Sequence, residues 1–257
     1  MTLETLAGVT ALELALIWLA TAGAALLRAF TGFGFALAAV PVYAFFLPPP
    51  EVVVLCASLA VVLGVQTLPQ YVHALEVQRQ WPVFLLALPG TVLGASLLRG
   101  LEADQFRLAL GIVTVVASLV LTRFHPARRE VHQGLRAGTG LASGLLNGAF
   151  AVPGPPIIVY IMATEADPAR SRAFMIGFFS FSALLGLATF ATLGWVTLQS
   201  LVLVLLAYPA MYAGDHVGFR LFRRHGGSHY RRIAVAACLA IGVALTLRAP
   251  VSKEKGR

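Results

Sequence analysis

Residues 32–43 read GFGFALAAVPVY and residues 147–158 read NGAFAVPGPPII, and the two stretches resemble each other. Each places a glycine-containing break before a short apolar segment with proline. The likeness continues downstream, where residues 89–94 (PGTVLG) match residues 209–214 (PAMYAG). The chain therefore reads as two copies of one element, about 8–124 and 133–249, within a single transmembrane domain spanning 1–257.

The composition is that of an integral membrane protein. Apolar residues make up 58% of the 257 residues and charged residues 12%, and the mean hydropathy is +0.83. A soluble domain carries about a quarter charged residues. The chain has too little charge to cover a surface that faces water, which excludes a soluble enzyme, a secreted disulfide scaffold and a disordered chain.

The apolar runs predict an all-α, polytopic protein with about ten helical segments. A spanning helix needs roughly 20 residues. Runs of suitable length lie near 9–30, 52–72, 81–99, 106–123, 134–151, 172–192, 196–218 and 231–248. Two further runs, 33–47 and 154–164, reach only about 16–22 Å as helices. We expect these two to be broken or half helices, one in each copy.

Charge predicts how the two copies are oriented. Arginines gather in the loops 123–136 and 219–232. The positive-inside rule places both loops in the cytoplasm, which requires an even number of crossings between them. Five segments in each copy satisfy this, so we expect inverted repeats, an N-terminus outside and a location in the plasma (cytoplasmic, inner) membrane. The same rule explains the net charge of +8 without a nucleic-acid partner.

Inverted repeats with interrupted helices are typical of secondary transporters, whose substrate sites lie at the interruptions. A helix that begins at such a break presents free N–H groups and the positive end of its dipole, which together favour an anion. The sequence thus predicts an anion held at a central site between the two broken helices. Its residues are Thr31, Gly32 and Gly34 at the first break and Asn147, Gly148 and Gly154 at the second. The alternative is that these small residues only allow close helix packing.

Four polar side chains extend this hypothesis. Arg28 precedes the first break, where it either binds the anion or extends to the cytoplasmic headgroups. Gln66 could donate to substrate oxygens or join two helices. Asp215 and His216 could relay protons as the coupling ion, or Asp215 could pair with Arg220 or Arg223. No cofactor and no metal site is expected, and Cys56 and Cys238 read as small core residues.

Two other classes of function stay open at this point. The first is an intramembrane enzyme that acts on a lipid-linked or membrane substrate, for which Ser143, Asp215 and His216 are the only candidate groups. The Gly140–Gly144 stretch superficially suggests a serine protease but has Leu141 two residues before Ser143. The second is a scaffold or sensor subunit, against which the absence of a soluble domain argues. A homo-oligomer in the bilayer is compatible with either reading.

Further motifs carry a resemblance to a known family. The first break leads to Pro41, a Pro48–Glu51 turn, Gln80-Trp81 and then the Pro89–Gly94 motif, and the second half repeats the pattern. The repeated elements are Gly148, Gly154-Pro155-Pro156, Gly194-Trp195 and Gly214. Over nearly its whole length the chain resembles the TauE/SafE sulfite exporter family of membrane anion permeases.

That resemblance implies export or uptake of a small sulfur-containing anion, such as sulfite, sulfoacetate or another organosulfonate. The chain departs from the family pattern at the breaks, where Phe33, Phe35, Ala149 and Phe150 stand in places that other members fill with glycine. Bulkier residues there imply a narrower or more apolar site. The direction of transport is left open.

Overall fold

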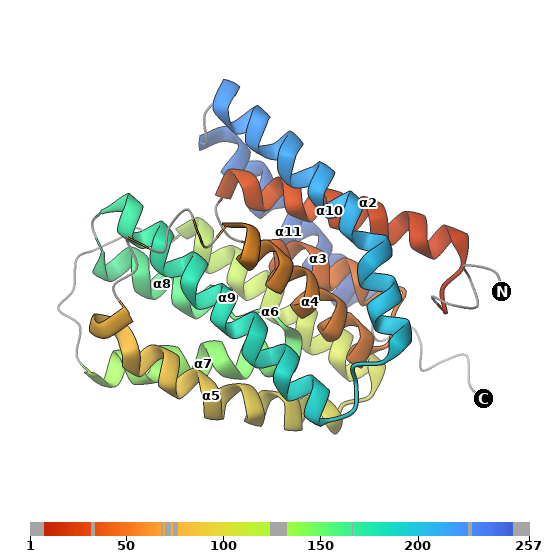
Figure 1. Cartoon of the computed structure of the whole chain (residues 1–257), viewed down its shortest axis with the longest axis horizontal. Helices are drawn as coiled ribbons and strands as arrows, with labels where there is room; N and C mark the ends of the chain where they lie inside the picture. Colours follow the sequence, from red (N-terminus) through yellow and green to blue (C-terminus); the bar gives the residue numbers. More distant parts are fainter. Residues whose placement is uncertain are drawn as a thin grey trace. The chain divides into compact units, whose positions relative to one another are not determined.

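The computed structural model describes residues 8–31, 34–67, 69, 73, 77–123, 133–165, 167–225 and 228–248. Across these residues the chain forms ten α-helices and no β-strand (Figure 1). They are α2 (Ala11–Thr31), α3 (Phe35–Tyr43), α4 (Pro49–Thr67), α5 (Val77–Arg99), α6 (Ala103–Arg123), α7 (Gln133–Phe150), α8 (Gly154–Thr164), α9 (Pro168–Thr192), α10 (Leu198–His225) and α11 (Ser228–Arg248). The predicted all-α fold with ten segments is confirmed.

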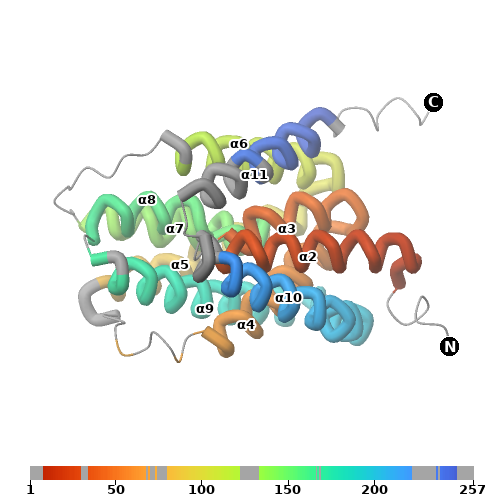
Figure 2. The backbone as a smooth tube through the Cα atoms, turned by 90° about the horizontal axis from the view of Figure 1, so that it is seen from above, coloured from red at the N-terminus to blue at the C-terminus, as the bar shows by residue number. Residues whose placement is uncertain are grey.

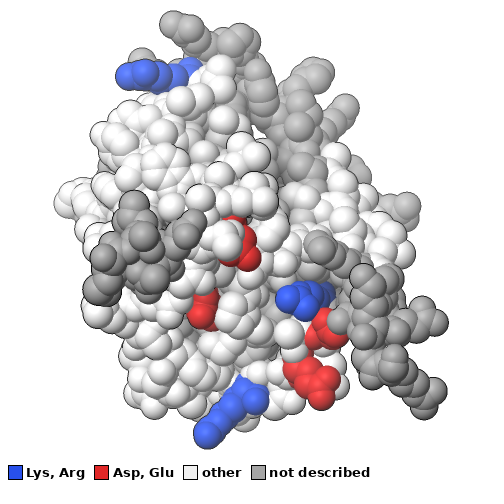
Figure 3. All heavy atoms as spheres, turned by 90° about the vertical axis from the view of Figure 1, so that its right-hand side faces the viewer, with Lys and Arg blue, Asp and Glu red and all other residues white. Residues whose placement is uncertain are grey.

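Most of the long helices have the length and composition of membrane spans. Within the described residues, six helices are long and apolar enough to cross a bilayer, namely α2, α4, α5, α6, α9 and α10. Large apolar side chains on them face outward, such as Leu97, which is 56% exposed, and Leu205, which is 72% exposed. On the face drawn in Figure 3, Lys, Arg, Asp and Glu side chains cover only a small part of the described surface. These features identify a multi-pass membrane protein.

The first break falls where the sequence predicts it. α2 ends at Thr31, and α3 begins at Phe35 with Gly34 as its N-cap residue. Gly34 has a φ of 97°, in the left-handed region that residues with a Cβ avoid. α3 has only nine residues, so it is too short to cross a bilayer alone. Gly32 and Phe33 lie outside the described residues.

The second break lies four residues later than predicted. Asn147 and Gly148 belong to α7, which continues to Phe150. The chain leaves the helix at Ala151, whose φ is 54°, and α8 begins at Gly154 after Pro153. Pro153 lacks a backbone N–H and disfavours the helical conformation at Val152, whereas a glycine can remain inside a helix when its missing side chain is used for packing. The expectation that Asn147 and Gly148 form the break is therefore wrong.

The described residues divide into two compact units. Unit one holds α2, α3, α6, α10, α11 and the start of α4 up to Cys56. Unit two holds the rest of α4 from Ala57, together with α5, α7, α8 and α9. Each unit therefore combines helices from both sequence copies. In unit one α10 packs along α2, and in unit two α5 packs along α7 (Figures 1 and 2).

In unit two, α7 meets α5 through a stripe of glycines. Cβ atoms added at Gly140, Gly144 and Gly148 would each collide with a backbone carbonyl of α5, those of Val83, Ala87 and Thr91 respectively. In return, a Cβ at Gly94 of α5 would collide with the Leu145 carbonyl of α7. Small residues spaced four apart let two membrane helices approach backbone to backbone. The packing alternative considered for Gly148 is thus realised.

Unit one repeats this arrangement between α10 and α2. A Cβ at Gly214 would collide with the Ala22 carbonyl, and one at Gly218 would crowd Leu26 and Ala29. Gly214 is the sequence match of Gly94, so the two copies use the same glycine for the same kind of contact. A buried hydrogen bond of 2.7 Å between Thr21 Oγ1 and Tyr43 Oη then attaches α3 to α2.

Candidate functional site

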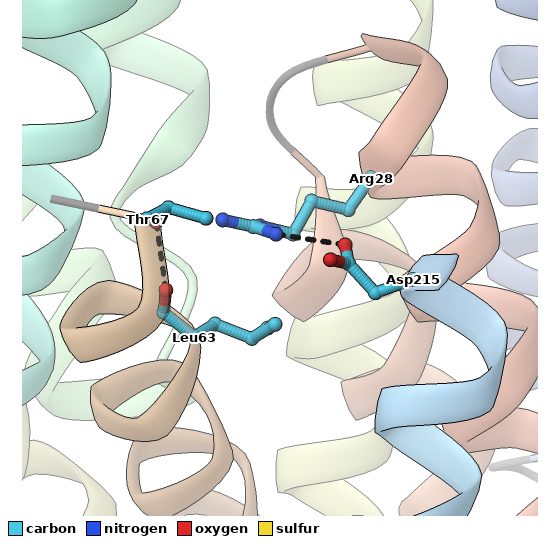
Figure 4. A network of polar contacts seen from close by, with 4 residues as sticks. All are labelled: Arg28, Leu63, Thr67 and Asp215. Atoms are coloured by element: carbon cyan, nitrogen blue, oxygen red, sulfur yellow. Dashed lines mark hydrogen bonds and ion pairs between the residues drawn. The ribbon is translucent and has the colours of Figure 1, made fainter. Parts of the chain in front are cut away.

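Arg28 and Asp215 form an ion pair in unit one (Figure 4). Arg28 lies in the last turn of α2, and its Nη1 donates to Asp215 Oδ1 of α10 at 3.0 Å. The side chains are 14% and 25% exposed. The contacts of Gly214 and Gly218 with α2 lie on either side of Asp215 along α10. Close helix approach at these glycines therefore brings a carboxylate to the guanidinium.

The ion pair shows that Arg28 and Asp215 are partners of each other. Both lie within helices that qualify as membrane spans. An arginine in a bilayer costs at least about 2.5–3.5 kcal/mol, and a carboxylate partner reduces that cost. Asp215 pairs with Arg28, and among the described residues no ion pair joins it to Arg220, so the suggested pairing with Arg220 is wrong. The side chain of Arg223 lies outside the described residues.

The amino end of α3 has the features of an anion-binding end. Phe35, Ala36 and Leu37 carry N–H groups that the helix itself does not use, and the N-cap residue, Gly34, has no side chain that could cap them. The first intrahelical bond comes from Ala38 N to the Gly34 carbonyl at 3.1 Å. Thr31 is the last residue of α2, and its side chain lies outside the described residues. The N–H groups and the dipole of α3 together favour negative charge.

Arg107 binds the opposite end of α3, a contact that sequence reasoning missed. Its Nε donates to the Ala44 carbonyl at 2.8 Å, and its Nη1 pairs with Asp104 at 2.9 Å. A cation at a helix carboxyl end is favoured by the macrodipole. The available signal was the match of 105–107 (QFR) with 229–231 (HYR), which marks Arg107 but not its target.

The amino end of α8 offers fewer donors than that of α3. Gly154 is its first residue, and Pro155 and Pro156 follow. Proline has no backbone N–H, so Gly154 and Ile157 are the only donors among the first four residues. The two short helices therefore match in position and differ in the number of backbone N–H donors at their amino ends.

Asn147 joins α7 to two neighbouring helices of unit two. The residue is 3% exposed, and its Nδ2 lies 2.8 Å from the Ser182 carbonyl of α9 and 3.3 Å from Thr91 Oγ1 of α5. A side-chain amide has two N–H donors, and both are engaged here. Binding of an anion by Asn147 would require this network to open.

We expect Asn147→Leu to lower the thermal unfolding temperature in detergent, because the two bonds are lost and the Ser182 carbonyl loses a donor. The free energy of unfolding should fall by about 1–2 kcal/mol. The test is to measure both the melting curve and the transport kinetics of the variant and of the wild type. A raised KM without a change in melting temperature would contradict the structural role and point to substrate contact.

The other predicted residues lie on exposed helix faces. Gln66 is exposed near the end of α4, beside Thr67, whose Oγ1 donates to the Leu63 carbonyl at 2.7 Å (Figure 4). His216 is exposed on α10, and its ring lies against Tyr212 with centroids 4.2 Å apart. Of the predicted side chains in unit one, the structure brings Arg28 and Asp215 together.

Comparison with known proteins agrees with these features. The family described as "Sulfite exporter TauE/SafE" matches residues 17–245, a range that includes both breaks and both short helices. A protein of Cupriavidus necator named "Probable sulfite/organosulfonate exporter TauE" is 26% identical over 204 residues, which cover 75% of this chain and 80% of that protein. No solved structure matches the chain significantly.

Proposed function

Because this chain belongs to the TauE/SafE sulfite exporter family, we propose that it carries a small sulfur-containing anion, such as sulfite or an organosulfonate, across the membrane. Its membership of a family of exporters makes it a membrane transporter and not an enzyme. The observation that carries the substrate proposal is the family match across both breaks, supported by the name of the C. necator relative.

We propose that the residues in contact with the anion lie mainly at the first break. The N–H groups at the start of α3 that the helix does not use, together with the left-handed Gly34, support this assignment. Thr31 and Gly32 complete the predicted backbone path, and Arg28 supplies a positive charge. The anion would approach the backbone closely here because Gly34 has no side chain.

The remaining predicted contacts belong to the same proposal. Gln66, Asn147, Gly148 and Gly154 are retained as candidate contacts from the sequence pattern. The amide of Asn147 is already hydrogen-bonded and prolines follow Gly154, so the first break is favoured as the stronger binding element.

We likewise propose that the two sequence copies are inverted repeats within one transmembrane domain. We also propose that the protein lies in the inner membrane with its N-terminus outside.

The experiment is uptake of radiolabelled sulfite into proteoliposomes, with unlabelled organosulfonates as competitors. We expect saturable uptake beyond that of empty liposomes, and competition by sulfonates but not by a neutral sulfone of similar size. An imposed pH gradient tests protons as the coupling ion, for which Asp215 and His216 are the proposed groups. Absence of flux for every sulfur anion, with folded protein, would contradict the substrate proposal.

A further inference from the structure

The Arg28–Asp215 pair can be compared with a matching place in unit two. The match is made by counting from the helix ends and not by the sequence repeat, which pairs Asn147 with Gly32. Arg28 lies three residues before the end of α2, and Asn147 lies three residues before the end of α7. Asp215 follows Gly214 on α10, and Ala95 follows Gly94 on α5. Each position thus has a counterpart in the same kind of helix pair.

The counterparts carry no charge. Asn147 donates to Thr91 Oγ1 across α7 and α5, and Ala95 is fully buried. A Cβ at Gly148 would lie 2.6 Å from the Ala95 nitrogen, so Ala95 stands at the α5–α7 contact. The same packing is therefore achieved in unit two with an amide, a hydroxyl and a methyl group. Close packing of such a helix pair does not require an ion pair.

A charge pair that packing does not require, and that is costly in a bilayer, indicates a functional role. Polar residues inside membrane spans usually mark substrate or ion pathways. Arg28 lies on the last turn of α2, immediately before the break that leads to α3. Arg28 is therefore close in sequence to the proposed anion contacts.

We propose that Asp215 is a positioning residue that occupies Arg28 in the absence of substrate and yields it to the transported anion. The inference rests on the proposed function. A carboxylate and a sulfonate are both anions with several acceptor oxygens, so each can accept charge-assisted N–H bonds from a guanidinium. The incoming anion replaces the carboxylate, and Asp215 returns to Arg28 when the anion leaves.

This exchange predicts a specific kinetic change in Asp215→Asn. Removing the competing charge should lower the KM for sulfite by about fivefold or more, the scale of a typical coupling between two ligands. Vmax should fall as well, because no carboxylate is present to take the place of the anion when the anion departs from Arg28. Asp215→Glu keeps the competing charge and should keep both parameters near those of the wild type.

A double variant tests whether the pair is only structural. Arg28→Asn combined with Asp215→Ala gives unit one the residues that occupy the matching places in unit two. We expect this double variant to fold, as judged by its melting curve and elution profile, and to lose saturable sulfite uptake. A pair that serves packing alone would leave the double variant with the kinetics of the wild type.

The outcomes separate this inference from the proposed function. If the wild type takes up no sulfur anion, the proposed function is wrong and the exchange is wrong with it. If the wild type transports but Asp215→Asn leaves KM unchanged, or the double variant transports normally, the exchange alone is overturned. KM is a property of the folded molecules, so a lower yield of a variant does not obscure it.

Discussion

Replacing Gly148 with leucine should prevent α7 from packing against α5 and should abolish stable expression of the chain. A Cβ at this position already collides with the Thr91 carbonyl, and the backbone nitrogen of Ala95 lies 2.6 Å from it. Both obstacles are backbone atoms, so rotation of a side chain cannot relieve the clash. Overpacking of a well-packed core costs about 1–3 kcal/mol, and a backbone collision should exceed that range.

A matched control stands on the same helix. A Cβ at Gly138 meets nothing within 4 Å, so Gly138→Leu should leave folding intact. Gly214→Leu, which collides with the Ala22 carbonyl in unit one, should fail as Gly148→Leu does. The measurement is the yield of monodisperse protein in detergent. Normal yield and melting temperature for Gly148→Leu would contradict the α5–α7 packing.

Gly34→Val should abolish transport, because valine is strongly disfavoured at a φ of 97° and the amino end of α3 would have to move. Strain of this kind costs of the order of 1–3 kcal/mol. If the chain relieves the strain by changing φ, the N–H groups of Phe35, Ala36 and Leu37 lose their direction. We therefore expect sulfite uptake to fall far more than stability does.

Gly194→Val is the control for strain alone. Gly194 has a φ of 75°, and a Cβ there meets nothing within 4 Å. It lies between α9 and α10, away from either break in the sequence. The two variants should lose similar amounts of thermal stability, and only Gly34→Val should lose transport. Equal transport in both would remove the first break from the proposed site.

The helices could be predicted from the sequence because each is a continuous apolar run. Even α3 and α8 were identified as short elements, since glycine and proline mark their starts. Their identification needed only local information, namely run length and the residues at the ends. The first break was placed correctly for the same reason, because Gly34 is the residue that adopts the left-handed conformation.

The second break shows the limit of reading glycine locally. Gly148 resembles Gly34 in sequence context, but it faces the Thr91 carbonyl inside a continuous helix. Whether a glycine turns the chain or allows close packing depends on a helix far away in the sequence. Alignment by residue type therefore placed Gly148 in the break and missed the role of Ala151 and Pro153.

Polar partners were the least predictable feature of the candidate site. Asp215 lies 187 residues from Arg28, and nearby arginines on its own helix offered a simpler pairing. The bond from Arg107 to the Ala44 carbonyl is equally non-local. Such contacts follow from which helices pack together, and composition and spacing do not determine that.

The most direct test of the transporter account is counterflow. Proteoliposomes are loaded with unlabelled sulfite and diluted into a trace of labelled sulfite, without any imposed ion gradient. A carrier that moves sulfite should accumulate the label transiently above its equilibrium level, and wild-type protein should do so where Gly34→Val does not. Label that only equilibrates, or never enters beyond the level of empty liposomes, would contradict the claim that this chain is a carrier of small sulfur-containing anions.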